Sequence, residues 1–332
     1  MTATLDVALG VDRPDWFLEL LTEREPRIRL HFDRALYKKD RSPDEQAAFE
    51  AMLDSAEALL GLERDPAALA RAVRANPRLR WVHTIPAGGG QYIRRAGLTP
   101  HELERVLFTT SAGVHARPLS EFALFGVLAG AKRLPVLQAE QRARSWDRDL
   151  ALRMLDDLTV LVVGLGGIGR ETAERLRALG CRVIGVTRRP VDGFETVRVE
   201  QFADVASTAD AIVLALPNTE LTRHLLSVDV LAHVKPGMIV VNVGRGTTID
   251  ETALIAALQD GRVGFAALDV TEVEPLPQDS PLWTMPNVVI APHVAANTPN
   301  NARRIAELFA ENARRLLDGE PLLNRVNTVE FY

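Results

Sequence analysis

Cysteine is almost absent from this sequence of 332 residues, because Cys181 is the only one. An internal disulfide is therefore excluded, and a reducing compartment such as the cytoplasm is expected. Cys181 stands at the start of an apolar run, and no pattern of catalytic partners surrounds it. We interpret it as a small core residue rather than as a nucleophile.

Lysine and long apolar runs are also scarce. Only four of the 39 basic residues are lysine, so a pair of adjacent arginines carries little information by itself. The formal net charge is -5 and no long basic run occurs, which argues against a nucleic-acid partner. The N-terminus has no signal-peptide pattern, and the apolar run 122–131 is too short to span a bilayer. No His, Cys or Asp cluster has metal-ligand spacing. We expect a cytoplasmic protein that binds no membrane, nucleic acid or metal.

Strand-like apolar runs alternate with helical patterns along most of the chain. Seven such runs lie in the segment 158–292, and five more lie before residue 111. Their apolar residues are continuous rather than alternating, which is typical of parallel strands covered on both faces. Helical patterns lie between them, and a long amphipathic helix is indicated near the C-terminus. The sequence therefore predicts an α/β protein built from two doubly wound domains.

A glycine-rich loop follows the apolar run that begins at Leu158. Gly164, Gly166 and Gly169 form the pattern G-x-G-x-x-G between a predicted strand and a predicted helix. In that context the glycines allow a tight turn, a close approach of a pyrophosphate and close packing of the helix. The free amides and the dipole at the start of the helix attract phosphate charge. We predict that the loop binds a dinucleotide through Gly164, Gly166, Gly167, Ile168 and Gly169. The alternative is a glycine-rich turn without a ligand.

The end of the next predicted strand lacks the acid that usually binds the adenosine ribose. Thr187 takes that place and is followed by Arg188 and Arg189. A carboxylate there would repel a 2′-phosphate, whereas threonine removes the repulsion and leaves a hydroxyl donor. Either arginine could pair with the phosphate through charge-assisted hydrogen bonds. The sequence thus favours NADP over NAD, and the alternative is that the arginines are solvated surface charges.

Three segments at the ends of later strands carry polar residues suited to catalysis. They are "NVGRGTTIDE" with Arg245, "ALDVTEVEPLP" with Asp269 and Glu274, and "APHVAANT" with His293. Ligands of open α/β sheets bind beyond those strand ends. Together with "GLGGIG", "LPNTELT" and "GVHARPLSEFAL", these segments resemble the D-isomer-specific 2-hydroxyacid dehydrogenases, in particular the glyoxylate/hydroxypyruvate reductases. The resemblance covers most of the chain, and the segments stand in the family order.

The resemblance implies a domain arrangement. In this family a Rossmann nucleotide-binding domain is inserted into a flavodoxin-like substrate domain, and the active site lies between them. The substrate domain would comprise residues 1–116 and 298–332, and the NAD(P)-binding domain would comprise residues 117–297. Family members are commonly homodimers, and the segment 118–146 would supply the interface here.

The family's roles also fit the chemistry of the residues. His293 is a suitable proton donor to the carbonyl oxygen of a 2-keto acid, and Glu274 can orient its imidazole. Arg245 offers a permanent charge and a planar fork to the substrate. Asp269 would contact the nicotinamide side of the cofactor. Each residue could instead be structural or merely solvated. The remaining cofactor contacts expected in these segments are Leu216, Pro217, Thr222, Val243, Gly244, Arg245 and His293.

The loop "IPAGGGQYI" is expected to bind the substrate carboxylate beside Arg245 and His293. Its binding groups would be Ala87 and the backbone amides of Gly88 and Gly89, since loop amides can form an anion site. Gly89 and Gly90 stand where many members have a hydrophobic residue and an acid, and Ala295 and Ala296 stand where glycine or serine is common. These departures put the identity of the substrate in doubt, and a flexible turn is the alternative for the loop.

We therefore predict an NAD(P)-dependent D-2-hydroxyacid dehydrogenase that interconverts a small 2-keto acid, such as glyoxylate or hydroxypyruvate, and its 2-hydroxy acid. Two alternatives remain open. One is a phosphoglycerate-type dehydrogenase with NAD as its cofactor. The other is a non-catalytic dinucleotide sensor that resembles the family's transcriptional corepressor.

Overall fold

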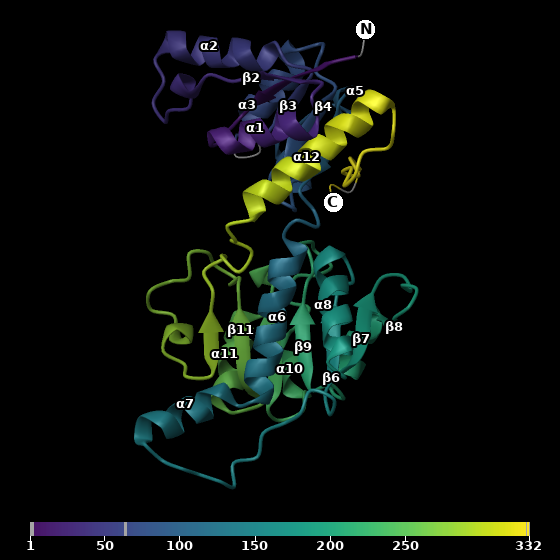
Figure 1. The fold of residues 1–332 in the computed structure, drawn as a ribbon. Helices are drawn as coiled ribbons and strands as arrows, with labels where there is room; N and C mark the ends of the chain where they lie inside the picture. Colours follow the sequence, from purple (N-terminus) through teal and green to yellow (C-terminus); the bar gives the residue numbers. More distant parts are fainter. Residues whose placement is uncertain (1–2, 63–64, 330, 332) are drawn as a thin grey trace. The chain divides into compact units, whose positions relative to one another are not determined.

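A computed structural model describes residues 3–62, 65–329 and 331. The chain folds as two compact units, and one of them is discontinuous in sequence. The first unit consists of residues 1–115 and 298–332, and the second consists of residues 116–297. Figure 1 shows the elements of each unit.

The first unit is built on a parallel sheet of five strands in the order β2–β1–β3–β4–β5. This order is the flavodoxin-like one that the resemblance implies, and each strand coincides with a predicted apolar run. The strands are β1 (Leu5–Leu9), β2 (Ile28–His31), β3 (Ala58–Leu60), β4 (Trp81–Thr84) and β5 (Leu107–Thr110).

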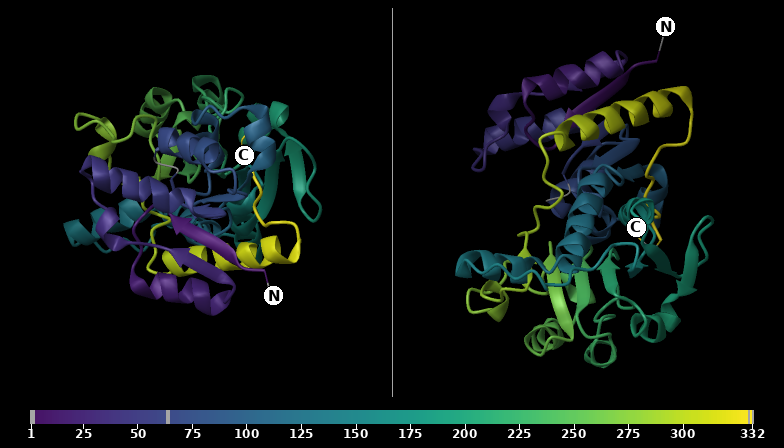
Figure 2. Two further views of the ribbon diagram at one scale, coloured as in Figure 1. Left: turned by 90° about the horizontal axis from the view of Figure 1, so that it is seen from above. Right: turned by 60° about the horizontal axis from the view of Figure 1, so that its bottom comes forward.

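Helices cover both faces of this sheet. On one face α1 (Asp15–Arg24) and α12 (Asn301–Asp318) pack side by side, although they come from opposite ends of the chain (Figures 1 and 2). The other face is covered by α2 (Pro43–Asp54), α3 (Pro66–Ala75), α4 (Gly90–Arg95) and α5 (Pro100–Arg105). A short 3-10 turn, Arg34–Leu36, precedes α2.

The segment after α12 returns to the edge of this sheet and pairs with β5. Thr110 donates its backbone amide to the carbonyl of Asn324 at 3.1 Å, and Val326 donates to the carbonyl of Phe108 at 2.8 Å. An antiparallel bridge joins Thr109 to Arg325. Val326 is buried among the apolar residues of this face, so the segment completes the core of the first unit.

A histidine lies inside this core. His83 on β4 is fully buried, with Nδ1 at 2.8 Å from the hydroxyl of Thr109 and Nε2 at 3.0 Å from the hydroxyl of Ser111. The ring of Trp81 stacks on Phe309 of α12 at a centroid distance of 4.4 Å. Burial lowers the pKa of His83 from 6.5 to about 3, because the charged imidazolium would lose its hydration.

We expect the free energy of unfolding to fall as the pH is lowered from about 6.5 towards 3. The unfolded chain binds a proton at this histidine below about pH 6.5, whereas the folded chain keeps the ring neutral. The resulting slope is at most about 1.4 kcal/mol per pH unit. Urea titrations at several pH values should show a smaller slope for His83→Gln than for the wild type. His101→Gln, at an exposed position, is the matched control and should keep the wild-type slope. Equal slopes for the wild type and H83Q would show that His83 is not the group responsible.

The second unit contains a parallel sheet of seven strands in the order β12–β11–β10–β9–β6–β7–β8. This order extends the Rossmann arrangement by one strand, and the fold class predicted from the sequence is confirmed. The strands are β6 (Thr159–Val163), β7 (Arg182–Thr187), β8 (Glu195–Arg198), β9 (Ala211–Leu214), β10 (Met238–Asn242), β11 (Val263–Leu268) and β12 (Val288–Ile290). Cys181 is buried just before β7, and burial raises the pKa of its thiol, as befits a core residue.

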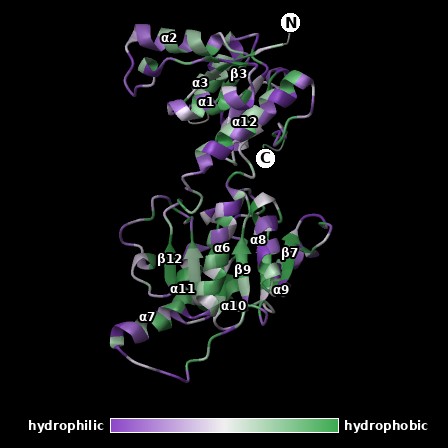
Figure 3. Cartoon of the chain, in the orientation of Figure 1, coloured by the Kyte–Doolittle hydropathy of each residue, from purple (hydrophilic) through white to green (hydrophobic). Residues whose placement is uncertain are grey.

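Helices cover both faces of this sheet as well. α6 (Ala116–Ala131) and α8 (Gly167–Ala178) pack on one face, while α9 (Phe202–Ala206), α10 (Val228–Ala232) and α11 (Glu251–Gln259) pack on the other. Hydrophobic residues predominate in the strands between them (Figure 3). Short 3-10 turns occur at Val199–Gln201, Gly246–Thr248 and Pro281–Trp283.

The helix α7 (Leu134–Ala143) extends away from the rest of the second unit and has no buried residue (Figure 1). It follows α6 after a bend of 59°. Within the residues described above, no single helix is long and apolar enough to cross a membrane, and only the bent pair α6–α7 meets that test by length and composition.

Candidate active site

The glycine loop connects β6 to α8 in the second unit. Gly164 has φ +95°, and a Cβ atom at Gly169 would lie 1.8 Å from the carbonyl oxygen of Gly164. The tight turn and the close helix packing therefore both require glycine. Gly166 and Gly167 are exposed at the start of α8, and a Cβ atom at Gly166 would meet no atom within 4 Å. The loop thus leaves open space beside the first-turn amides of the helix.

The end of β7 differs in one respect from the expectation. The hydroxyl of Thr187 donates to the carbonyl oxygen of Arg189 at 2.6 Å, and Thr187 is buried. In this conformation the hydroxyl of Thr187 is therefore used within the chain, and its contact with the cofactor stays a prediction. The bond holds the turn that exposes Arg188 and Arg189.

The loop after β9 contains Leu216, Pro217 and Thr222. It is closed by the Thr222 hydroxyl, which lies 2.8 Å from the carbonyl oxygen of Pro217 and accepts the amide of Thr219 at 2.9 Å. Thr222 therefore fixes the shape of this loop.

The loop after β10 presents Arg245. The side chain of the buried Asn242 accepts the amide of Gly244 at 3.0 Å and donates to the carbonyl of Arg245 at 3.0 Å. Thr248 donates its amide to the same carbonyl at 3.1 Å. The guanidinium of Arg245 is partly buried and donates through Nη1 to the carbonyl of Gly244 at 2.7 Å. The backbone beneath this cation is therefore tightly fixed.

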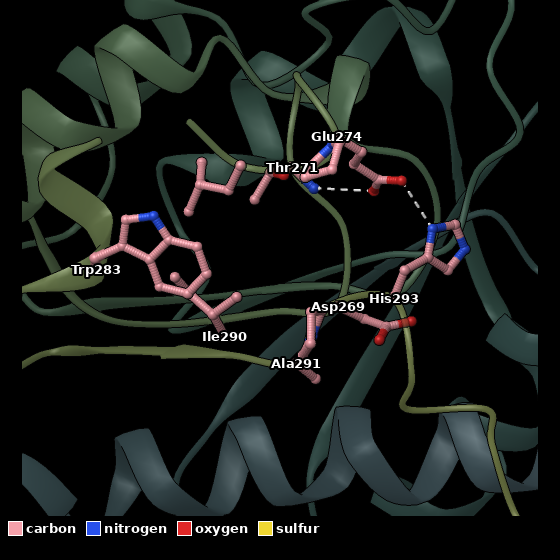
Figure 4. Close-up of a pocket in the computed structure, with 10 residues that line it drawn as sticks. Asp269, Thr271, Glu274, Trp283, Ile290, Ala291 and His293 are labelled. Atoms are coloured by element: carbon pink, nitrogen blue, oxygen red, sulfur yellow. Dashed lines mark hydrogen bonds and ion pairs between the residues drawn. The ribbon is translucent and has the colours of Figure 1, made fainter. Parts of the chain in front are cut away.

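His293 and Glu274 form a hydrogen-bonded pair at the ends of β12 and β11 (Figure 4). The distance from Nδ1 of His293 to Oε2 of Glu274 is 2.9 Å. The other carboxylate oxygen of Glu274 accepts the amide of Thr271 at 3.3 Å. The backbone amide of Thr271 thus fixes the carboxylate on the side away from His293, and Nε2 of His293 points away from the carboxylate.

Asp269 fixes the backbone on which His293 stands. Its carbonyl oxygen accepts the amide of His293 at 2.8 Å, and its carboxylate accepts the amide of Ala295 at 2.8 Å. His293 has φ +56°, an uncommon conformation for a residue other than glycine. Burial raises the pKa of Asp269, and the amide of Ala295 partly offsets that rise. Sequence reasoning assigned Asp269 only to the cofactor and missed this positioning role.

A cavity of about 420 Å³ lies against the same residues in the second unit. Its far wall is the half-exposed indole of Trp283, opposite Asp269 and His293 (Figure 4). Trp283 was not among the residues singled out in the sequence, because an isolated aromatic residue near a proline carries no recognisable signal. The other lining residues are Thr271, Glu274, Pro275, Leu276, Ile290, Ala291 and Pro292.

The predicted substrate loop lies in the first unit, between β4 and α4. The amide of Gly89 donates to the carbonyl of Pro86 at 3.2 Å, so it is already used within the loop. The prediction that this amide is free for a carboxylate is therefore wrong for this conformation. A Cβ atom at Gly90 would lie 2.2 Å from the carbonyl oxygen of Phe331. The segment after α12 thus explains why Gly90 carries no side chain.

Residues 124–295, more than half of the chain, match the family described as "D-isomer specific 2-hydroxyacid dehydrogenase, NAD binding domain". The chain belongs to this family. The resemblance inferred from the sequence is thereby confirmed, and the protein is an NAD(P)-dependent oxidoreductase that acts on 2-hydroxy acids.

Three similar proteins of the 2-hydroxyacid dehydrogenase family cover nearly the whole chain. A glyoxylate reductase of Korarchaeum cryptofilum is 31% identical over 314 residues, which are 91% of each protein. The structure of a Xanthobacter autotrophicus Py2 D-isomer specific 2-hydroxyacid dehydrogenase, in complex with NADPH and MES, is 31% identical and has a TM-score of 0.81, with 99% of this chain and 100% of that chain covered. The NADPH-dependent glyoxylate/hydroxypyruvate reductase of Sinorhizobium meliloti, in complex with NADP and sulfate, is 26% identical and has a TM-score of 0.78, with the same coverage.

Proposed function

We propose that this 2-hydroxyacid dehydrogenase is an NADPH-preferring reductase of small 2-keto acids such as glyoxylate or hydroxypyruvate. The observation that carries the proposal is the 2.9 Å contact between His293 and Glu274. It lies at the same edge of the sheet as the glycine loop and Arg245, because the carboxyl ends of parallel strands share one edge. The two similar structures described above hold NADPH or NADP.

The cofactor fits the residues that would hold it. The open space beside Gly166 suits a pyrophosphate at the start of α8, and the exposed Arg188 and Arg189 suit a 2′-phosphate. When bound, the nicotinamide supplies the hydride that reduces the carbonyl carbon. The further cofactor contacts that we propose are Gly164, Gly167, Ile168, Gly169, Thr187, Leu216, Pro217, Thr222, Val243, Gly244, Arg245, Asp269 and His293.

We propose that His293 acts as the general acid in reduction and as the general base in oxidation. Its Nε2 would donate a proton to the carbonyl oxygen as negative charge develops there. Glu274 orients the ring through Nδ1 and favours its protonated form. The Arg245 guanidinium would bind the substrate carboxylate and polarise the carbonyl. Ala87 and Gly88 are proposed as further carboxylate contacts in the first unit, which we propose to be the substrate domain.

The proposal is tested by initial rates with NADPH and NADH on glyoxylate, hydroxypyruvate, pyruvate and phenylpyruvate. We expect kcat/KM to be higher with NADPH. The double variant Arg188→Ala/Arg189→Ala should lower kcat/KM for NADPH by about 10- to 100-fold and leave that for NADH unchanged, since charge-assisted hydrogen bonds contribute roughly 1.5–3 kcal/mol. Arg182→Ala, at an exposed arginine at the opposite end of β7, is the matched control. A wild-type preference for NADH would show that the two arginines are surface charges.

We also propose that the protein forms a homodimer in the cytoplasm, where NADPH is available. Support comes from large apolar side chains exposed on α6, on α7 and in the segment after α7. They are Phe125, Leu128, Leu137, Trp146, Leu152 and Met154, and Trp146 is 85% exposed. Large apolar side chains exposed along one segment are a feature of interaction surfaces. Light scattering should give twice the chain mass of 36.5 kDa, and a monomer at micromolar concentration would refute the dimer.

A further inference from the structure

Two histidine–glutamate pairs meet at the same short turn of the second unit. The turn 271–274 carries Glu274, which pairs with His293, and Glu272, which pairs with His224. The second contact joins Nε2 of His224 to Oε1 of Glu272 at 2.6 Å. His224 comes from the loop after β9, two residues beyond Thr222. The second pair therefore joins the proposed cofactor loop to the turn that holds the catalytic glutamate.

Glu272 is held from a second side by the start of α11. Its amide donates to the carboxylate of Glu251 at 2.9 Å, and its own Oε2 accepts the amide of Glu251 at 3.4 Å. Arg223 adds an ion pair to Glu272 at 3.4 Å. The side chains of Glu272 and His224 are only 24% and 33% exposed, so solvent screens this contact less than it screens a surface pair.

The loop that carries Arg245 is joined to the same structure. The amide of His224 donates to the carbonyl of Thr247 at 2.8 Å, and the amide of Leu226 donates to the carbonyl of Thr248 at 3.0 Å. A Cβ atom at Gly246 would lie 1.8 Å from the carbonyl oxygen of Thr271, so the loop after β10 and the loop after β11 are in direct backbone contact. Three loops, from β9, β10 and β11, thus form one packed assembly around Glu272.

We propose that Glu272 and His224 are positioning residues for hydride transfer. Glu272, held by His224, fixes the distance between the cofactor loop, Arg245 and the His293–Glu274 pair. This inference rests on the proposed function, because it assigns a purpose to the site described above. Neither residue touches the reacting atoms in this arrangement, so each acts through Glu274 and Arg245. A displacement of about 1 Å at such a site can lower the rate by about 100-fold.

The test is a double-mutant cycle with His224→Asn and Glu272→Ala. Asparagine tolerates the positive φ of His224 (+47°) but cannot reach Glu272. We expect each single variant to lower kcat with NADPH and glyoxylate by about 10-fold or more, with the KM for glyoxylate little changed. The double variant should be no slower than the worse single variant, because both remove the same contact. Glu272→Gln keeps the acceptor and should restore most of kcat.

His233→Asn is the matched control, because the ring of His233 at the end of α10 lies against its own helix, with Nδ1 at 2.8 Å from the carbonyl oxygen of Asp229. Its kcat should equal that of the wild type. The inference would be overturned if the losses in kcat multiplied in the double variant. It would also be overturned if the variants had a lower melting temperature but an unchanged kcat. Fluorescence titration measures the affinity for NADPH of the same three variants without turnover. We expect the double variant to lose no more affinity than the worse single variant, and losses that multiply would overturn the coupling. If the wild type showed no turnover, only the proposed function would be refuted. The NADPH titration would still show whether His224 and Glu272 act together.

Discussion

Replacement of His293 by asparagine should lower kcat for the reduction of glyoxylate by about 10²- to 10⁴-fold, the usual contribution of a general acid. Asparagine is suited to this position because it tolerates the positive φ of His293 (+56°). The carboxylate of Asp269 can therefore still hold the amide of Ala295. The variant loses the proton donor and keeps the backbone of the site. Initial rates at saturating NADPH measure the effect.

Binding of NADPH to the same variant, followed by fluorescence, should remain within a few-fold of the wild type. His101→Asn, at an exposed position on α5, should show neither effect. The variant also separates the enzyme, which would lose turnover and keep NADPH binding, from a non-catalytic dinucleotide sensor, which has no turnover to lose. Undiminished turnover in His293→Asn would remove this residue from the mechanism.

Replacement of Arg245 by alanine should lower kcat/KM for glyoxylate by about 10²- to 10³-fold, since truncating one partner of a hydrogen-bonded charge pair costs roughly 2–5 kcal/mol. Lysine should recover only part of the loss, because an ammonium lacks the planar fork that binds a carboxylate through two parallel bonds. Part of the forked group already donates to the carbonyl of Gly244. The remaining donors are therefore directed by a fixed loop.

Steady-state kinetics with varied glyoxylate should place most of the Arg245→Ala loss in KM together with a smaller loss in kcat. Arg262→Ala is a suitable control, because Arg262 pairs with Asp260 at the other end of the sheet. An unchanged KM for glyoxylate in Arg245→Ala would show that the substrate carboxylate is bound by other groups.

The strands and their order were accessible from the sequence to different degrees. Continuous apolar runs such as that from Leu158 predict the strands directly, because both faces of a parallel strand are buried. The apolar runs do not show which strands are neighbours in a sheet, and the order of the strands was expected from the family resemblance. The contact between His293 and Glu274 was expected on chemical grounds, and the structure supplies its distance of 2.9 Å.

The details that sequence reasoning missed all depend on backbone turns. The hydroxyl of Thr187 and the amide of Gly89 are donors in any chain, but the turns at Arg189 and Pro86 place a carbonyl within reach of each. A residue type reveals what a group can bind, and only the local dihedral angles decide which partner is closest. The same holds for Asp269, whose carboxylate meets the amide of Ala295 only because of the turn at His293.

The return of the C-terminal segment to β5 has a consequence for synthesis on the ribosome. All seven strands of the second unit are made before the first residue of α12 emerges. The synthesis of the first unit begins earlier, but at that stage the unit lacks the helix that covers Trp81 and the segment that contributes Val326 to its core. The unit whose synthesis begins first is therefore the last to finish folding. Until residue 326 has left the ribosome, the nascent chain exposes an unfinished apolar face, which is the kind of surface that chaperones bind.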